Sequence, residues 1–373
     1  LHYPLRRQRQ MCIRDRSSTL VALALRIADT YAPGDADIVI LDVFTASLDR
    51  LKKLAHVRGY AGPGNTSESR QLQKRVLRYI SAELERRSAH PHDSFAPLFV
   101  LIDGFATLRE GYSDVDDMSL IESFYQVWAK GPAMGIHCVA TTTRLKALPP
   151  AISDLTGQKW LYQLADTSEY HPTVDKDNHP ANLPGRFVST TRAHHGHVGL
   201  PDDIDAAVAA INEFWGVDGL PPLVQEFPKR VGPEQLTNCF ASGNETWQIP
   251  VGINEADLNP YVLEAFAGEH VLVSGPARSG KSTMLAAIHQ MLVQESPNTK
   301  ILVGAPRRSP LHQMLPGVMC PEQLVDVVET QSAAPEPCIV LIDDAHLVAD
   351  DSQVLARVLA LPDSPLLFNR GWA

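Results

Sequence analysis

The sequence predicts an α/β fold with two tandem domains, each built on a mostly parallel sheet that helices cover. Two strongly apolar runs end in an aspartate, LFVLID at 98–103 and CIVLID at 338–343. Continuous apolar strands that alternate with helical segments are typical of parallel sheets buried on both faces. A second pattern also occurs twice, because Ser18 and Ser282 each open an apolar helical stretch that is followed by a proline fifteen residues after the serine. The sequence therefore predicts an internal repeat, with one α/β domain in each half.

Residues 1–16 differ in character from the rest of the chain. They hold five arginines and one aspartate, a charge of +4, so the remainder carries −14 in a chain whose formal net charge is −10. The segment has no helical or strand periodicity. Two interpretations are a basic arm that binds nucleic acid and a non-native or artefactual segment.

Three further ranges complete the predicted organisation. The first domain is expected at 17–215 and the second at 231–373. The intervening stretch 216–230, GVDGLPPLVQEFPKR, is rich in glycine and proline and lacks periodicity. Such a composition predicts a linker.

The clearest chemical signal lies at residues 275–283 of the second domain. Residues 269–274 read as a short buried strand that runs into GPARSGKS, a full G-x-x-x-x-G-K-S pattern, and then into a helix. This strand–loop–helix context is typical of a phosphate-binding loop. Glycines let the backbone aim successive N–H groups at phosphate oxygens, and the helix N-terminus adds its dipole. The nucleotide-binding residues predicted on this basis are Gly275, Pro276, Ala277, Arg278, Ser279, Gly280, Lys281, Ser282, Thr283 and Asp343.

Individual roles can be assigned from the chemistry of such loops. Lys281 is expected to reach the β- and γ-phosphates of ATP, and the Ser282 hydroxyl to ligate Mg²⁺. Asp343 ends an apolar strand, the position from which a carboxylate holds the Mg²⁺ shell through water. The predicted cofactors are therefore ATP and Mg²⁺, with Ser282 and Asp343 as the metal-side residues.

Asp344 is the single candidate catalytic residue. It lies where many ATPases of this type have a glutamate that activates the attacking water. One methylene fewer draws the carboxylate back by roughly 1.5 Å, and general-base geometry tolerates little misplacement. The alternative is that Asp344 caps the following turn. The sequence thus favours nucleotide binding without fast turnover.

The first domain is expected to lack a phosphate-binding loop in the given sequence. Superposing Ser18 on Ser282 places Met11, Arg16 and Ser17 where the second domain has Gly275, Gly280 and Lys281. The phosphate-binding loop is missing at the point where residues 1–16 end. This favours the interpretation of residues 1–16 as a non-native or artefactual segment. The apolar strand also ends in Asp103-Gly104, and a glycine cannot act as a base.

Two further features concern strand ends. GIHCVATTT at 135–143 predicts a strand whose threonines either sense a γ-phosphate or cap the strand. Counted from His137, that strand begins 34 residues after Asp103, and the same offset from Asp343 gives position 377, past residue 373. We therefore expect the second domain to be truncated at its C-terminus and the tail 362–373 to be irregular.

Other candidates have less specific patterns. His194, His195 and His197 suggest a metal site or, as we prefer, a polar hairpin. Arg186 and Arg192 are either trans-acting phosphate ligands or, as we prefer, structural ion-pair partners.

Composition excludes several classes of protein. There are 33 Lys and Arg against 43 Asp and Glu, which argues against attraction of nucleic acid to the whole surface. Five widely spaced cysteines without a C-x-x-C pair indicate a reduced, cytosolic chain. No apolar run approaches the length of about 18 residues that a membrane span needs.

The motifs together resemble those of the FtsK/SpoIIIE ATPases. Within that class they resemble the tandem ATPase modules of EccC/EssC, the motor of type VII (ESX) secretion in bacteria. The resemblance covers about residues 17–360. It is carried by LFVLIDGFATLRE at 98–110, WAKGPAMGIHCVATTTR at 128–144, LPGRFV at 183–188 and IPVGINEADLNPYVLEAF at 249–266.

The resemblance implies two tandem P-loop domains with a RecA/FtsK-like fold, corresponding to the second module and most of the third. It implies further ATPase modules and a membrane-anchored part of the same motor as partners, a ring-shaped oligomer, and helical-hairpin secretion substrates. The location implied is the cytoplasm, as the cytosolic part of a membrane-associated complex. Later modules of that family bind ATP weakly or without hydrolysing it.

The function expected is an ATP-binding module of a type VII secretion motor that couples nucleotide binding to substrate recognition and export. Two alternatives remain open. One is a fragment of an FtsK/SpoIIIE-type DNA translocase, against which the negative net charge argues. The other is a regulatory scaffold that binds nucleotide without turnover.

Overall fold

The structure is a computed structural model that separates into two compact units, residues 1–227 and 228–373, each considered by itself. It describes residues 3–64, 66–112, 115–164, 170, 174, 178–191, 194–217, 219–232, 235–236, 241–242, 246–266, 269–320, 323–324, 326–327, 330, 338–347, 356 and 366–371, of which 3–14, 115–116, 241–242 and 366–371 are described by their backbone alone. Among these residues no helix combines the length and the hydropathy that a membrane crossing requires.

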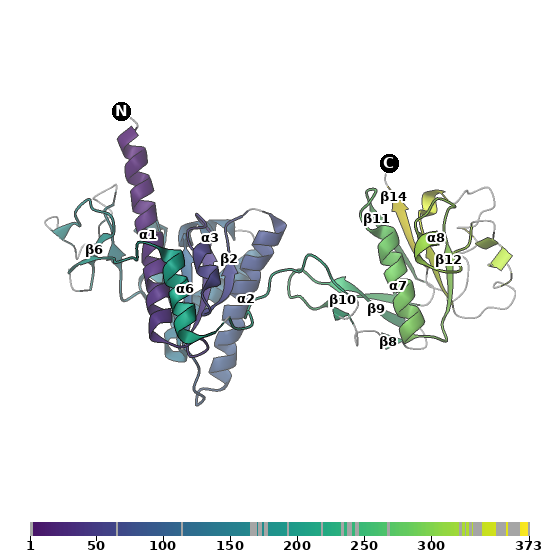
Figure 1. Ribbon diagram of the computed structural model, residues 1–373, viewed down its shortest axis with the longest axis horizontal. Helices are drawn as coiled ribbons and strands as arrows, with labels where there is room; N and C mark the ends of the chain where they lie inside the picture. Colours follow the sequence, from purple (N-terminus) through teal and green to yellow (C-terminus); the bar gives the residue numbers. More distant parts are fainter. Residues whose placement is uncertain are drawn as a thin grey trace. The chain divides into compact units, whose positions relative to one another are not determined.

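The first unit, coloured purple to teal in Figure 1, is built on a four-stranded sheet in which every pairing is parallel and the strand order is β2-β1-β3-β4. A small antiparallel sheet, β5-β6-β7, follows it in the chain. The elements are α1 (Tyr3–Thr30), β1 (Asp37–Asp42), η1 (Asp49–Lys53), β2 (Val57–Ala61), α2 (Ser67–Ala89), β3 (Leu98–Asp103), α3 (Phe105–Gly111), α4 (Val115–Lys130), η2 (Gly131–Met134), β4 (Ile136–Ala140), η3 (Leu145–Ala147), α5 (Pro150–Ser153), β5 (Trp160–Leu161), β6 (Arg186–Ser189), β7 (His195–His197) and α6 (Ile204–Trp215).

Helices cover both faces of this sheet, as the continuous apolar strands predict. Successive side chains of a strand point to opposite faces. Ile38 and Ile40 of β1 pack with α1 and α6, while Val39 and Leu41 pack with α2 and α4. All four side chains are fully buried. The predicted helix-covered α/β architecture is confirmed for this unit.

The N-terminal segment differs from expectation in its backbone. Helix α1 runs without a break from Tyr3 to Thr30, so it includes most of the segment 1–16, whose sequence lacks helical periodicity. Among the side chains of α1 that the structure describes, hydrophobic packing on the sheet begins at Leu20, with Val21 and Ala24 also buried. The predicted linker 216–230 also differs in part, because Leu223 donates its N–H to the Arg58 carbonyl oxygen at 2.7 Å and packs on the first unit.

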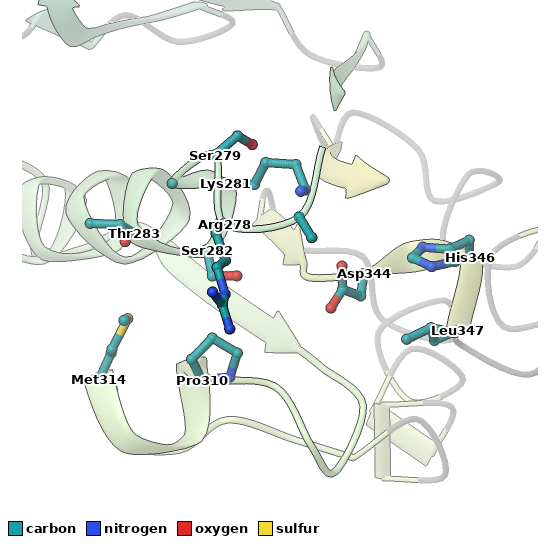
Figure 2. Close-up of a pocket in the computed structure, with 12 residues that line it drawn as sticks. Arg278, Ser279, Lys281, Ser282, Thr283, Pro310, Met314, Asp344, His346 and Leu347 are labelled. Atoms are coloured by element: carbon teal, nitrogen blue, oxygen red, sulfur yellow. The ribbon is translucent and has the colours of Figure 1, made fainter. Parts of the chain in front are cut away.

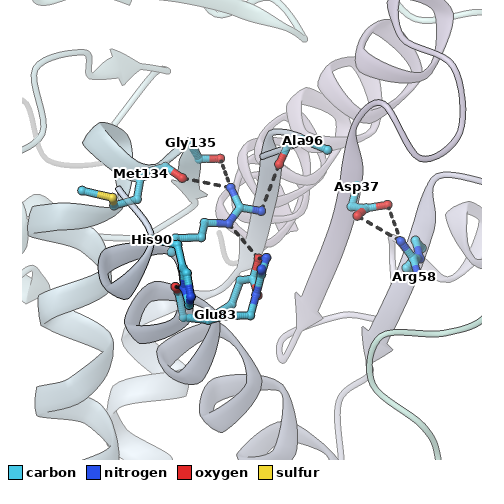
Figure 3. A network of polar contacts seen from close by, with 9 residues as sticks. Asp37, Arg58, Glu83, His90, Ala96, Met134 and Gly135 are labelled. Atoms are coloured by element: carbon cyan, nitrogen blue, oxygen red, sulfur yellow. Dashed lines mark hydrogen bonds and ion pairs between the residues drawn. The ribbon is translucent and has the colours of Figure 1, made fainter. Parts of the chain in front are cut away.

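A buried ion pair fastens the end of α2 to the sheet (Figure 3). The Arg87 guanidinium donates to Glu83 Oε1 at 2.7 Å and to the carbonyl oxygens of Met134, Gly135 and Ala96 at 2.9, 3.2 and 2.9 Å. The Arg87 side chain is 5% exposed and that of Glu83 is 9% exposed. Because these bonds join α2 to η2 and to the segment just before β3, Arg87 links its own helix to the neighbouring strand and to an element 47 residues away in sequence.

Replacing Arg87 with Met should lower the free energy of unfolding of the first unit by about 3 kcal/mol, because it removes the buried cation that pairs with Glu83, leaving Arg86 as that carboxylate's remaining ion-pair partner, and removes three hydrogen bonds to carbonyl groups. Thermal or urea unfolding measures the loss. The matched control is Arg26→Met, whose partner Asp29 lies in an exposed pair and should be worth less than about 1 kcal/mol. Equal effects of the two substitutions would contradict the role assigned to Arg87.

The same pair predicts the response of stability to acid. Burial acts to raise the pKa of Glu83, but hydrogen bonds from Arg86 and Arg87 outweigh it and hold the pKa below its ordinary value. The ionised Glu83 side chain therefore contributes its stabilisation at pH values above its unfolded-state pKa of about 4.3. This contribution is lost as the pH falls through the lower folded-state pKa of Glu83. Urea unfolding at a series of acidic pH values measures this loss, and it should be smaller in Glu83→Gln than in wild type.

The second unit contains a parallel sheet in the order β11-β14-β13-β12 and an antiparallel sheet in the order β10-β9-β8. Side chains of α7 and of β9 share one hydrophobic core with β12 and β13. The elements are β8 (Ala241–Ser242), β9 (Thr246–Ile253), β10 (Pro260–Phe266), β11 (His270–Gly275), α7 (Lys281–Glu295), β12 (Lys300–Gly304), α8 (Leu311–Met314), β13 (Cys338–Ile342), η7 (Ala345–Leu347) and β14 (Leu366–Gly371).

Two expectations for this unit are wrong. The tail is not irregular, because Leu366–Gly371 forms β14 and pairs in parallel with both β11 and β13. The offset taken from the first unit failed because the chain from Asp343 to the start of β14 is shorter than the chain from Asp103 to the start of β4. The strand before the phosphate loop is also less buried than predicted, since Leu272 of β11 is 52% exposed.

Candidate functional site

The predicted phosphate-binding loop connects β11 to α7 in the second unit. Gly280 has a φ of 89° and immediately precedes the first residue of α7, a left-handed conformation that glycine adopts without steric cost. Arg278 has a φ of 63°, which is uncommon for a residue with a side chain. A Cβ at Gly275 would lie 2.9 Å from Ser279 Oγ, so a larger residue there would require the Ser279 side chain to shift. Gly280 is thus the position of this loop where the backbone conformation itself favours glycine.

Lys281 begins α7 and points back into the loop. Its Nζ donates to the carbonyl oxygens of Gly275 at 3.1 Å and Pro276 at 2.8 Å. These bonds place the ammonium group over the loop, where a phosphate group would be a stronger acceptor than the two neutral carbonyls. Figure 2 shows the side chain beside the cavity that the loop borders.

The metal-side residues meet at the end of β13. Asp343 is fully buried, and Ser282 Oγ lies 3.0 Å from each of its two carboxylate oxygens. Ser309 Oγ donates to Asp343 Oδ2 as well. Hydroxyl and carboxylate oxygens are the ligand types that Mg²⁺ prefers. The donor set therefore fits the predicted ion.

The cavity beside the loop has a volume of about 470 Å³. Asp344 lines it and has a φ of 45°, a backbone conformation in which aspartate is enriched over most other residues. The turn that follows is closed by the Asp344 carbonyl oxygen, which accepts the Leu347 N–H at 2.7 Å. The lining residues are Ala277, Arg278, Ser279, Gly280, Lys281, Ser282, Thr283, Pro310, Met314, Asp344, His346 and Leu347 (Figure 2).

The first unit repeats this arrangement, with a correction to the predicted register. Ser17, not Ser18, is the counterpart of Ser282, because the Ser17 hydroxyl donates to Asp103 Oδ2 at 2.7 Å and is buried. The helices agree with this register, since α1 ends at Thr30 and α7 at Glu295, the same interval after the serine in each unit. The equal spacing from serine to proline placed the predicted register one residue too late. The reason is that the connection from α1 to β1 is longer than the connection from α7 to β12.

Threonine and arginine side chains complete the site of the first unit. Thr141 Oγ1 donates to Asp103 Oδ1 at 2.6 Å and accepts the Gly104 N–H at 2.9 Å. This geometry favours strand-end capping for Thr141 over the sensing of a phosphate. In the corrected register Arg16 takes the position of Lys281, and it donates to the Thr142 carbonyl oxygen at 3.0 Å.

Buried carboxylates meet at this end of the first sheet. Asp42 and Asp103 are register partners on β1 and β3, and both are buried. Burial raises the pKa of Asp42 above its ordinary value and the Asp103 charge adds to the rise, while the Leu48 N–H opposes both. In the second unit Ala305 occupies the position that corresponds to Asp42, so this carboxylate pair is specific to the first unit.

The remaining candidates belong to the first unit, whereas the phosphate loop belongs to the second. The histidines do form the preferred polar hairpin, since β7 pairs antiparallel with β6 and His197 Nε2 lies 2.8 Å from the Pro184 carbonyl oxygen. Within the described residues no group of three or more His, Cys, Asp and Glu side chains could hold a metal ion. Arg186 lies on β6, and Arg192 lies outside the described residues.

Ser309 is the site residue that the sequence did not reveal. It lies in a loop whose contact with Asp343 depends on the fold of the whole unit, and RRSP at 307–310 matches no nucleotide-binding pattern.

Comparison with known proteins identifies the relatives of the chain. The ESX secretion system protein EccC of Thermomonospora curvata is 28% identical over 315 residues, which is 75% of this chain and 23% of that protein. The ESX-1 secretion system protein EccCb1 of Mycobacterium tuberculosis is 25% identical over 340 residues, 81% of this chain and 56% of that protein. The chain therefore spans between about a quarter and a little over half of the length of these relatives. No family model matches it.

Solved structures agree with the fold. The cytoplasmic domain of the T. curvata type VII secretion ATPase EccC has a TM-score of 0.70 at 23% identity, covering 95% of this chain and 48% of that one. ATPases 2 and 3 of T. curvata EccC, in complex with a signal sequence peptide, have a TM-score of 0.67 at 22% identity, covering 95% and 74%. The chain's homologues are thus ESX secretion ATPases of the EccC/EssC type, and the resemblance noted in the sequence is confirmed.

Proposed function

We propose that this chain is an ATP-binding module of a type VII secretion motor, which couples nucleotide binding to substrate recognition and export. The observation that carries the proposal is the loop at 275–283, which opens α7 and ends with Ser282 within hydrogen-bond distance of the buried Asp343. Homology to EccC supports the assignment to a secretion motor.

The residues of the loop have different roles in holding ATP. Backbone N–H groups of the loop and of the first turn of α7 bind phosphate oxygens at the positive end of the helix dipole. Lys281 exchanges its two carbonyl acceptors for the β- and γ-phosphates. Ser282 and Asp343 would hold Mg²⁺, which would supply positive charge beside the phosphate groups. Asp344 lines the same cavity and is the candidate for positioning an attacking water.

The proposed partners are those of the relatives. A signal sequence peptide is bound in the solved complex of T. curvata EccC ATPases 2 and 3, which supports a secretion substrate as a partner here. We propose that this substrate is a helical hairpin. The rest of the proposed assembly comprises further ATPase modules, a membrane-anchored part of the motor and a ring-shaped oligomer. The location proposed for the chain is the cytoplasmic side of that complex.

Titration of the full chain with a fluorescent ATP analogue in the presence of Mg²⁺ tests the proposal. We expect saturable binding that unlabelled ATP competes away, because the loop supplies the complete set of phosphate contacts. Duplex DNA titrated at two salt concentrations is the parallel measurement. Absence of nucleotide binding would contradict the proposal, and tight, salt-dependent DNA binding would favour the translocase alternative.

A further inference from the structure

Ser309 contacts the metal-side carboxylate from an element that no nucleotide-binding motif includes. It lies between β12 and α8 and is 6% exposed. Its hydroxyl donates to Asp343 Oδ2, the carboxylate oxygen that Ser282 also contacts. Asp343 is therefore held by two hydroxyl groups, one from the phosphate loop's helix and one from a loop that follows a different strand.

The orientation of the Ser309 hydroxyl is fixed by its other neighbour. The Leu311 N–H donates to Ser309 Oγ at 3.1 Å. A hydroxyl group has one proton to donate, and with the Leu311 N–H on the acceptor side that proton is directed to Asp343. The Ser309 N–H donates in turn to the Pro306 carbonyl oxygen at 2.9 Å, so the loop backbone is itself closed around the serine.

The first unit contains a longer contact of the same kind, without sequence similarity around it. Thr45 follows β1, the counterpart of β12; its Oγ1 lies 3.4 Å from Asp103 Oδ2 and also contacts Ser47 Oγ. Ser17 donates to the same oxygen at 2.7 Å. The loops differ in sequence, DVFTAS at 42–47 against GAPRRS at 304–309. A hydroxyl group from the same loop thus reaches the strand-ending aspartate in both units.

We propose that Ser309 is a positioning residue for the Mg²⁺ shell of the nucleotide site, an inference that rests on the proposed function. Its hydrogen bond fixes the rotation of the buried Asp343 carboxylate. With Oδ2 held by Ser309, Oδ1 is directed to the ion or to a water of its shell. Without this bond the Asp343 carboxylate rotates more freely. In some of its orientations it cannot contact the Mg²⁺ shell, and the affinity for Mg²⁺ falls.

The test measures binding of a fluorescent ATP analogue to the full chain across a Mg²⁺ titration and in EDTA. For Ser309→Ala we expect the Mg²⁺ concentration at half-maximal enhancement of binding to rise about tenfold, the effect of losing one hydrogen bond to a charged group. Affinity in EDTA should stay within about twofold of wild type. Ser309→Thr, which introduces the residue type of Thr45, should restore the wild-type midpoint.

Ser296→Ala is the matched control, because Ser296 is half-buried in the same unit and its hydroxyl bonds Thr299 Oγ1 at 2.7 Å, away from the site. Its Mg²⁺ midpoint should match wild type. A wild-type midpoint in Ser309→Ala, or an equal loss of affinity with Mg²⁺ and in EDTA, would overturn the inference alone. A wild-type chain that binds no nucleotide would instead defeat the proposed function on which the inference rests.

Discussion

Replacing Lys281 with Ala should lower the affinity of the chain for ATP by roughly 10- to 150-fold, which corresponds to a charge-assisted hydrogen bond worth about 1.5–3 kcal/mol. The ammonium group is already directed over the loop by the Gly275 and Pro276 carbonyl oxygens. Little reorganisation is therefore needed for it to reach a phosphate group. Calorimetric or fluorescence titration of wild type and variant measures the ratio.

Two controls separate loss of the contact from loss of the fold. Lys229→Ala removes an exposed lysine of the same unit outside the loop and should leave the affinity unchanged. Lys281→Met keeps much of the side-chain volume and should bind as weakly as Lys281→Ala. Unchanged affinity in both Lys281 variants would show that ATP does not bind at this loop.

Hydrolysis by the full chain should be slow or absent even when ATP is bound. The Asp344 carboxylate is drawn back by roughly 1.5 Å from the place of a glutamate, and such a displacement costs on the order of a hundredfold or more. Asp344→Glu should therefore raise turnover by a factor of that order. The left-handed backbone at this position should cost the glutamate some stability, because aspartate tolerates it better. A steady-state phosphate-release assay measures the turnover, and thermal unfolding measures the stability.

Lys281→Ala in the same assay reports any contaminating ATPase. Wild-type turnover near ~1 s⁻¹, in the ordinary range for enzymes, that disappears in Lys281→Ala would show that Asp344 suffices. The same result would exclude the alternative in which the chain is a regulatory scaffold without turnover. Slow turnover that Asp344→Glu fails to raise would mean that another group limits the reaction, such as an arginine from a neighbouring subunit.

Local pattern was enough to predict the sheets and the loop. Apolar strands ending in Asp103 and Asp343 and the sequence GPARSGKS each carry their signal within a few residues. Features that depend on the length of a connection were predicted less well. The register of Ser17 was wrong by one residue because the connection after α1 is longer, and β14 was missed because the connection before it is shorter than its counterpart in the first unit.

Ser309 could not be predicted for a different reason. Its role comes from the parallel pairing of β12 with β13, which brings the loop after one strand to the aspartate after the other. No property of the residues adjacent to Ser309 encodes that proximity. The backbone conformation of Asp344 could not be predicted for the same reason. Its left-handed conformation, which suits aspartate, is a property of the folded turn.

The position of β11 in its sheet has a consequence for how the nucleotide site is assembled during folding. Among the described strands β11 is an edge strand, and it pairs with β14, so that His270 lies beside Leu366 from the far end of the same unit. Contacts of such long sequence separation form slowly, because the intervening chain must first lose its conformational freedom. The loop that is proposed to bind phosphate therefore depends on a non-local pairing. On a ribosome the segment 270–283 emerges before the strand that pairs with β11, so we expect nucleotide to bind this unit only after β14 has joined the sheet.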